Sequence, residues 1–194
     1  MEMGKFIRIF NKTEDVVAEE MKKRHEKRSV LLHTLLLSAI LNVGILIIFF
    51  DEPVLGLLLA FPAFVLTMIS IPLIEYLTYL TAKSQGGRGD YWDQLNITNI
   101  YLTPIFLLFF AAFSLVTLLG LAGISLPDFP IGLDTLSLIF VIYLNYKKIK
   151  TVHAIDKALV PSIIYAVCVA AAYVLWVLLI FGPILILMII GGAI

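Results

Sequence analysis

Long apolar runs limit this chain to a small number of folds. A helix needs about 20 apolar residues to cross the hydrocarbon core of a bilayer. Five runs reach or approach that length, and a shorter apolar piece follows the last of them. They cover about residues 30–50, 54–82, 97–121, 131–146 and 158–182, with the extra piece at 184–194. The sequence therefore predicts an integral membrane bundle of about five transmembrane helices.

The composition agrees with a surface that faces lipid. Of the 194 residues, 61% are hydrophobic and only 14% are charged, and the mean hydropathy is +1.02. A soluble domain carries about 25% charged residues, so the chain has too few to cover a water-facing surface. Segments that are apolar on every side satisfy their backbone groups in lipid as helices. We therefore expect an all-α membrane domain over residues 29–194, preceded by a charged segment over residues 1–28.

The basic residues predict the orientation. Eight of the fourteen Lys and Arg residues lie before Ser29, and the other six lie in the loops after the second and fourth predicted spans. Those six are Lys83, Arg88, Lys147, Lys148, Lys150 and Lys157. Cytoplasmic loops carry an excess of Lys and Arg. With five spans all fourteen fall on one side, which predicts a multi-pass protein of the cell membrane with its N-terminus cytoplasmic and its C-terminus outside.

The N-terminal segment combines an apolar helical face with basic residues. Phe6, Ile7 and Phe10 follow the spacing of one helical face. A basic cluster precedes the first span, at Lys22, Lys23 and Arg24. Such a segment typically lies in the membrane interface and is attracted to anionic lipids. We predict a lipid-binding amphipathic segment, and the alternative is that the basic residues only orient the chain.

Polar residues within the predicted spans form the candidate site. Glu75 is the one acidic residue deep inside a span, and ionisable groups there usually face the bundle interior. His33 lies at a similar depth on the first span, and we expect Glu75 to meet it or the edge formed by Asn96 and Asn99. With Asn145, these residues would form a polar vestibule open to the cytoplasm. The alternative is that Glu75 reaches the lipid headgroups and is solvated there.

Two sequence elements resemble a known family. The third span is preceded by Gly86-Gly87-Arg88-Gly89 and contains Tyr101 and Pro104, and Val152-His153 precedes the fifth span. The Yip family of Ypt/Rab-interacting membrane proteins carries similar elements in this order, over roughly residues 30–182 of this chain. The resemblance implies five spans, a cytoplasmic N-terminus and a role in membrane organisation or trafficking. Asn99 stands where the family has Gly, and the Asp-Leu-Tyr-Gly-Pro motif of the eukaryotic branch is missing, which suggests a prokaryotic-type member.

Three functions compete. We favour a non-enzymatic protein that binds a protein or lipid partner at its cytoplasmic face, as the resemblance implies. The second is a small transporter or channel around Glu75, which predicts an aqueous cavity and a homo-oligomer. A membrane enzyme comes last, because the sequence shows no nucleophile–base pair and no zincin spacing. His153 and Asp156 could share a metal ion, but no third ligand is nearby, so we expect no metal site. We also expect no cofactor and no nucleic-acid partner.

Overall fold

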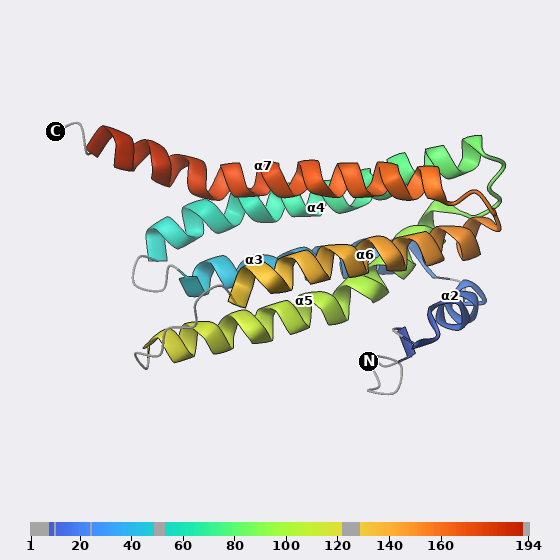
Figure 1. The fold of residues 1–194 in the computed structure, drawn as a ribbon, viewed down its shortest axis with the longest axis horizontal. Coiled ribbons are helices and arrows are strands. Elements are labelled where there is room, and N and C mark those ends of the chain that lie inside the picture. Colours follow the sequence, from blue (N-terminus) through green and yellow to red (C-terminus); the bar gives the residue numbers. More distant parts are fainter. Residues whose placement is uncertain (1–7, 10, 24, 49–52, 122–128, 192–194) are drawn as a thin grey trace.

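The described part of the chain is helical throughout. The computed structural model describes residues 8–9, 11–23, 25–48, 53–121 and 129–191. These ranges contain no strand, so the predicted all-α fold is confirmed for them. Their helices are α2 (Thr13–Met21), α3 (Lys27–Ile48), α4 (Pro53–Ser84), α5 (Tyr91–Leu121), α6 (Phe129–His153) and α7 (Leu159–Gly191) (Figure 1).

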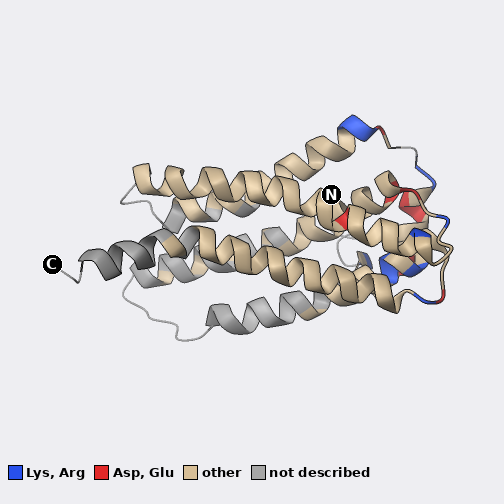
Figure 2. Cartoon of the chain, turned by 90° about the horizontal axis from the view of Figure 1, so that it is seen from above, with Lys and Arg blue, Asp and Glu red and all other residues tan. Residues whose placement is uncertain are grey.

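The five long helices lie side by side, and the short helix α2 lies against one end of them (Figure 1). Helix α3 packs against α4 and α5, while α6 packs between α5 and α7, and α7 also packs against α4. The connections from α4 to α5 and from α6 to α7 lie at the same end as α2 (Figure 1). Figure 2 shows that the charged residues of the described ranges gather there. We call this region, with α2 and the two connections, the charged end.

Helices α5 and α6 extend beyond the predicted spans at the charged end. Helix α5 begins at Tyr91 rather than near residue 97, and α6 ends at His153 rather than near residue 146. These extra turns contain polar residues, so an apolar run does not reveal them. They are nevertheless packed, because Leu95 and Ile149 are fully buried. Tertiary contacts therefore extend the helices past the apolar segments.

Prolines do not divide α4 or α7. Helix α4 continues through Pro62 and Pro72, and α7 continues past Gly182 and Pro183 to Gly191. A proline removes one helical hydrogen bond, but α4 packs along its length against α3 and α7. From the sequence, Pro183 after Gly182 predicts a break in the last apolar run. The structure contradicts this break, because the apolar piece at 184–194 belongs to α7 as far as Gly191.

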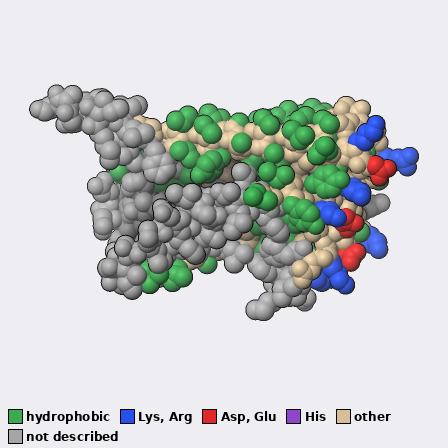
Figure 3. Space-filling model, in the orientation of Figure 1, with side chains coloured by type: hydrophobic (Ala, Val, Ile, Leu, Met, Phe, Trp, Pro, Cys, Tyr) green, Lys and Arg blue, Asp and Glu red, His purple; other side chains and the backbone are tan. Residues whose placement is uncertain are grey.

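Apolar side chains are exposed along the bundle away from the charged end (Figure 3). Examples are Phe61 on α4 and Val167 and Leu175 on α7, each more than half exposed. Two described segments are long and apolar enough to cross a membrane, Pro53–Ser84 and Leu159–Leu179.

The N-terminal segment packs against the bundle. Val16 and Val17 of α2, with Ile9 before it, are buried in a cluster that includes Ile97 of α5 and Leu144 of α6. Figure 1 shows α2 beside these helices. The predicted amphipathic face at Phe6, Ile7 and Phe10 lies outside the described residues, as does Arg24 of the basic cluster.

Candidate functional site

A buried ion pair joins α4 to α6 at the charged end. The side chains of Glu75 and Lys148 are each only 1% exposed. Lys148 Nζ donates to both carboxylate oxygens of Glu75 at 2.7 Å and to Thr98 Oγ1 on α5 at 2.6 Å. All three ammonium donors therefore have acceptors. Removing two charges from water is costly, and this cost is offset only when the buried charges contact each other closely and their remaining donors and acceptors are hydrogen-bonded.

Gln94 of α5 extends the network to the end of α6. Its Nε2 donates to Glu75 Oε2 at 2.6 Å and to the Glu75 carbonyl at 2.9 Å. Its Oε1 lies 2.6 Å from His153 Nε2. Since an amide oxygen only accepts, His153 Nε2 carries the proton and Nδ1 does not. Five residues from three helices thus form one hydrogen-bonded network, which we call the Glu75 network: Glu75, Gln94, Thr98, Lys148 and His153.

His153 is uncharged in this network. It is fully buried, and its Nδ1 has no hydrogen-bond partner among the described residues. Burial, followed by the positive charges of Lys148 and Lys83, lowers the pKa of His153 to about 4. Protonation would add a charge and an unpaired N–H group to the interior.

The predicted vestibule does not form as one group. His33 is hydrogen-bonded to Thr103 Oγ1 at 2.9 Å, so the predicted pairing with Glu75 is wrong. Asn99 donates to Thr34 Oγ1 and to the Val30 carbonyl, which joins α5 to α3. Glu75 is buried rather than solvated at the surface.

The other two asparagines lie elsewhere in the bundle interior. Asn96 and Asn145 are both buried, and neither contacts Glu75 through a hydrogen bond. Asn145 lines a small space between α5, α6 and α7 with Thr98 and Lys148. That space has room for about one water molecule.

Sequence reasoning missed the partner of Glu75. Lys148 follows the apolar run of the fourth span, so the sequence predicts that it lies in a loop. In the structure Lys148 lies inside α6, one turn after Leu144 and one turn before Val152, and all three are buried. This i, i+4, i+8 spacing places the lysine on the inner face of the helix. The neighbouring Lys147 instead pairs with Glu14 of α2 at 2.6 Å near the surface, and this contact lowers the pKa of Glu14.

The Gly-rich element closes α4 with a tight turn. Gly86 has a φ of +84°, a conformation that L-residues other than glycine rarely adopt. The Gly86 N–H donates to the Lys83 carbonyl at 3.0 Å, and the Gly87 N–H donates to the Ala82 carbonyl at 2.9 Å. This pair of bonds is a Schellman cap.

The two elements of the family resemblance contact each other. The Arg88 N–H donates to the His153 carbonyl at 3.0 Å. A Cβ on Gly87 would lie 2.9 Å from His153 Nδ1, and one on Gly89 would lie 2.6 Å from Val152 Cγ1. The loop before α5 therefore packs so closely on the end of α6 that a side chain larger than that of glycine would clash at Gly87 and at Gly89. Tyr101 and Pro104 lie further along α5, and the Tyr101 hydroxyl donates to the Thr13 carbonyl at 3.3 Å.

Two residues of the predicted lipid-binding cluster are described. Lys22 and Lys23 are exposed at the end of α2. Lys23 Nζ donates to Glu20 Oε1 at 2.8 Å, which raises the pKa of Lys23. Among the described residues, no group of three or more His, Cys, Asp or Glu side chains is placed to hold a metal ion.

The chain matches no protein-family model, no curated protein and no solved structure. The resemblance to the Yip family therefore stays a prediction.

Proposed function

We propose that the chain is a multispan membrane protein, not an enzyme, that binds a protein or lipid partner at its charged end on the cytoplasmic side. The observation that carries this proposal is the separation of surface types along the bundle. Charged side chains gather at one end, and apolar side chains are exposed along the rest (Figures 2 and 3). A bundle that crosses a bilayer needs this separation.

Helix α7 supports a membrane location. A long apolar helix in a soluble protein is normally covered by the rest of the fold. Within Leu159–Leu179, however, only 11% of the most apolar 18-residue stretch is buried inside the structure. Exposed apolar patches of this extent mark contact with lipid or with another protein. Contact with lipid also accounts for the exposed face of α4, which carries Phe61.

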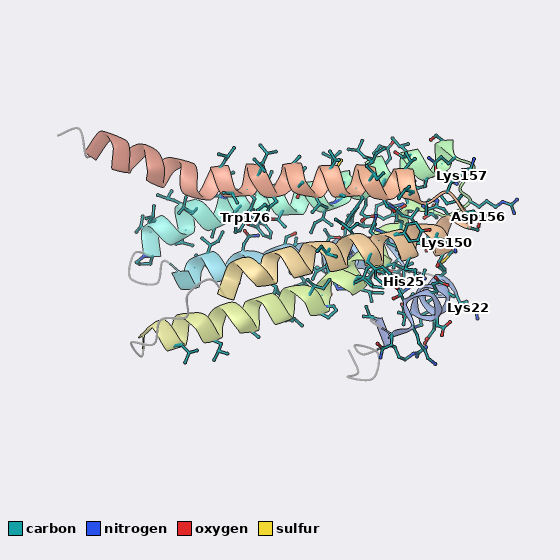
Figure 4. The ribbon with its side chains drawn as sticks, viewed as in Figure 1. Lys22, His25, Lys150, Asp156, Lys157 and Trp176 are labelled. Carbon is teal, nitrogen blue, oxygen red and sulfur yellow. The ribbon has the colours of Figure 1, made fainter. Side chains whose placement is uncertain are left out.

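The charged end supports a binding role. Lys22, Lys150 and Lys157 are exposed there, and they come from the residue after α2, from α6 and from the connection to α7 (Figure 4). Asp156 lies beside them in the same connection (Figure 4). A surface to which several segments contribute exposed ammonium groups suits an acidic protein or anionic headgroups. A role in membrane organisation or trafficking, as in the Yip family, is consistent with this surface.

The transporter alternative has less support. It requires water around Glu75, but Glu75 is held by Lys148 and Gln94 and is fully buried. The space beside Lys148 accommodates about one water molecule. A closed, fully bonded ion pair is typical of a structural link between helices.

The proposal is tested by photo-crosslinking in native membranes. A photoreactive residue replaces Lys22 or Lys157 at the charged end, and Val174 on the exposed apolar face of α7 in the matched control. We expect protein or headgroup adducts at the first two positions and only acyl-chain adducts at Val174. Adducts of one kind at all three positions, or none at Lys22 and Lys157, would contradict the proposed partner site.

A further inference from the structure

A small space between α5, α6 and α7 is open on one side. The proposed function assigns no ligand to it. It is lined by Thr98, Tyr101 and Leu102 from α5, by Asn145 and Lys148 from α6, and by Tyr165 from α7. We call it the Asn145 niche. Two members of the Glu75 network, Thr98 and Lys148, form one wall of the niche. Asn145 precedes Lys148 by about one helical turn, so it lies further from the charged end than that wall does.

Asn145 is the polar group that needs a partner. The residue is 3% exposed, and neither its amide nitrogen nor its amide oxygen has a hydrogen-bond partner among the described residues. Buried polar groups are almost always hydrogen-bonded in native proteins, because leaving them unpaired is costly. An amide offers donors and an acceptor side by side. A hydroxyl group, which donates and accepts, can satisfy both.

The niche presents no free charge. Lys148 uses its three donors on Glu75 and Thr98, and the carboxylate of Glu75 balances its charge. An anionic phosphate would therefore find no unpaired cation here. The remaining walls are the apolar side chains of Leu102, Ile105 and Leu144 and the side chains of Tyr101 and Tyr165. This lining suits an apolar chain attached to the polar group.

We propose that the Asn145 niche binds the hydroxyl end of an uncharged lipid, with the hydroxyl bonded to the Asn145 amide and the acyl part leaving through the open side. The polar space admits about one oxygen atom, which fits a single hydroxyl group and excludes a complete phospholipid headgroup. The inference rests on the proposed membrane location, and it concerns a different surface from the charged end.

The test measures binding of a photoactivatable diacylglycerol to the purified, delipidated full chain in detergent. Asn145→Leu keeps most of the side-chain volume and removes the amide. The matched control is Asn96→Leu, because Asn96 is also buried on the same bundle, its Nδ2 lacks a partner, and it does not line the niche. We expect binding at least tenfold weaker for Asn145→Leu and unchanged for Asn96→Leu.

The ligand is varied as well, so that the result does not depend on one variant folding. The methyl ether of the same lipid should compete at least tenfold less well with the parent protein, and phosphatidylglycerol should not compete. Equal competition by unlabelled diacylglycerol, its methyl ether and phosphatidylglycerol would overturn the proposal in favour of unselective lipid binding. Labelling unaffected by Asn145→Leu would overturn it in favour of a water molecule alone beside Asn145. Crosslinking at Lys22 and Lys157 is independent of this niche, so a failure here is distinguishable from a failure of the proposed function.

Discussion

At the scale of single residues, the Glu75–Lys148 pair has the largest expected energetic consequence. Removing one member leaves the other as an unpaired buried charge, which typically costs about 3–5 kcal/mol. We expect Glu75→Ala and Lys148→Ala to lower the unfolding temperature in detergent clearly, and Glu75→Gln to lower it less because it keeps part of the hydrogen bonding. The double variant Glu75→Met/Lys148→Met should regain most of the loss, since it removes both charges.

The exposed neighbouring pair provides the control for this prediction. Lys147→Ala removes the contact with Glu14 near the surface, where ion pairs contribute little. Its unfolding temperature should stay close to that of the parent. If the decrease in unfolding temperature of the double variant equalled the sum of the decreases of the Glu75 and Lys148 single variants, the two side chains would not be coupled.

The backbone conformation at Ala154 is strained for alanine and would be unstrained for glycine. It follows α6 with a φ of +50°, in the left-handed region that costs an L-residue about 1–2 kcal/mol. Ala154→Gly should therefore raise the free energy of unfolding by about 1 kcal/mol after the entropy of glycine is included. Ala170→Gly, at an exposed position inside α7, should lower it by about 0.5–1 kcal/mol. Chemical denaturation measures both, and a loss at Ala154 would contradict the strain.

His153 should make stability depend on pH. The folded protein resists protonation until about pH 4, whereas the unfolded chain takes up the proton near pH 6.5. Stability is therefore complete above about pH 6.5 and decreases as the pH falls toward 4, by up to about 1.4 kcal/mol per unit of pKa shift. His153→Gln should flatten this part of the curve of unfolding temperature against pH. The same slope in both proteins would place the titrating group elsewhere.

The candidate site was only partly predictable because its polar residues pair across helices. Glu75 is the acid deep within an apolar run, so its burial in the bundle follows from the cost that a charge would have in the proposed lipid surroundings. Its partner depends on how α4, α5 and α6 pack, which a single sequence does not specify. His33 was expected because of matched depth, but depth does not determine which side of a helix faces which neighbour.

At the scale of elements, α2 is held by a small apolar face. Val16 is buried against the bundle and Ala18 is exposed on the same helix. Burying a valine contributes about 1.5–3 kcal/mol, so Val16→Asp should release α2. Backbone amides of α2 should then exchange hydrogen at least tenfold faster in a mass-spectrometric measurement. Ala18→Asp should leave the exchange unchanged, and equal effects of the two variants would mean that α2 is not docked through this face.

The helices could be predicted from the sequence more reliably than their ends. Apolar runs reveal a helix where it is apolar on all sides, as in α4 and α7. They do not reveal the first turns of α5 or the last turns of α6, where residues such as Gln94 and Lys148 are polar and buried. Those turns are stabilised by contacts between distant segments. Pro62 and Pro72 likewise do not end α4, which packs against α3 and α7.

At the scale of the whole molecule, the proposed orientation makes opposite ends of the bundle accessible from opposite sides. In a Cys168→Ser background, cysteines introduced at Ser84 and Lys150 should react with a membrane-impermeant reagent only from the cytoplasmic side. A cysteine at Pro53, which is exposed at the other end of α4, should react only from outside. Labelling of position 150 from outside would exclude the five-span arrangement, and labelling of all positions from both sides would argue against a membrane protein.

The distance in sequence between Glu75 and Lys148 also has a consequence for how the protein is made. The two residues are 73 positions apart. A ribosome adds about 5–20 residues per second, so the nascent Glu75 carboxylate waits roughly 4–15 s for its counter-ion. In the proposed membrane arrangement, the Glu75 side chain of α4 therefore lacks the contact with Lys148 throughout that interval. In this proposed arrangement, a chain that stops before α6 keeps the acid without its counter-ion, so we expect α4 to be less stable in the bilayer without the later helices.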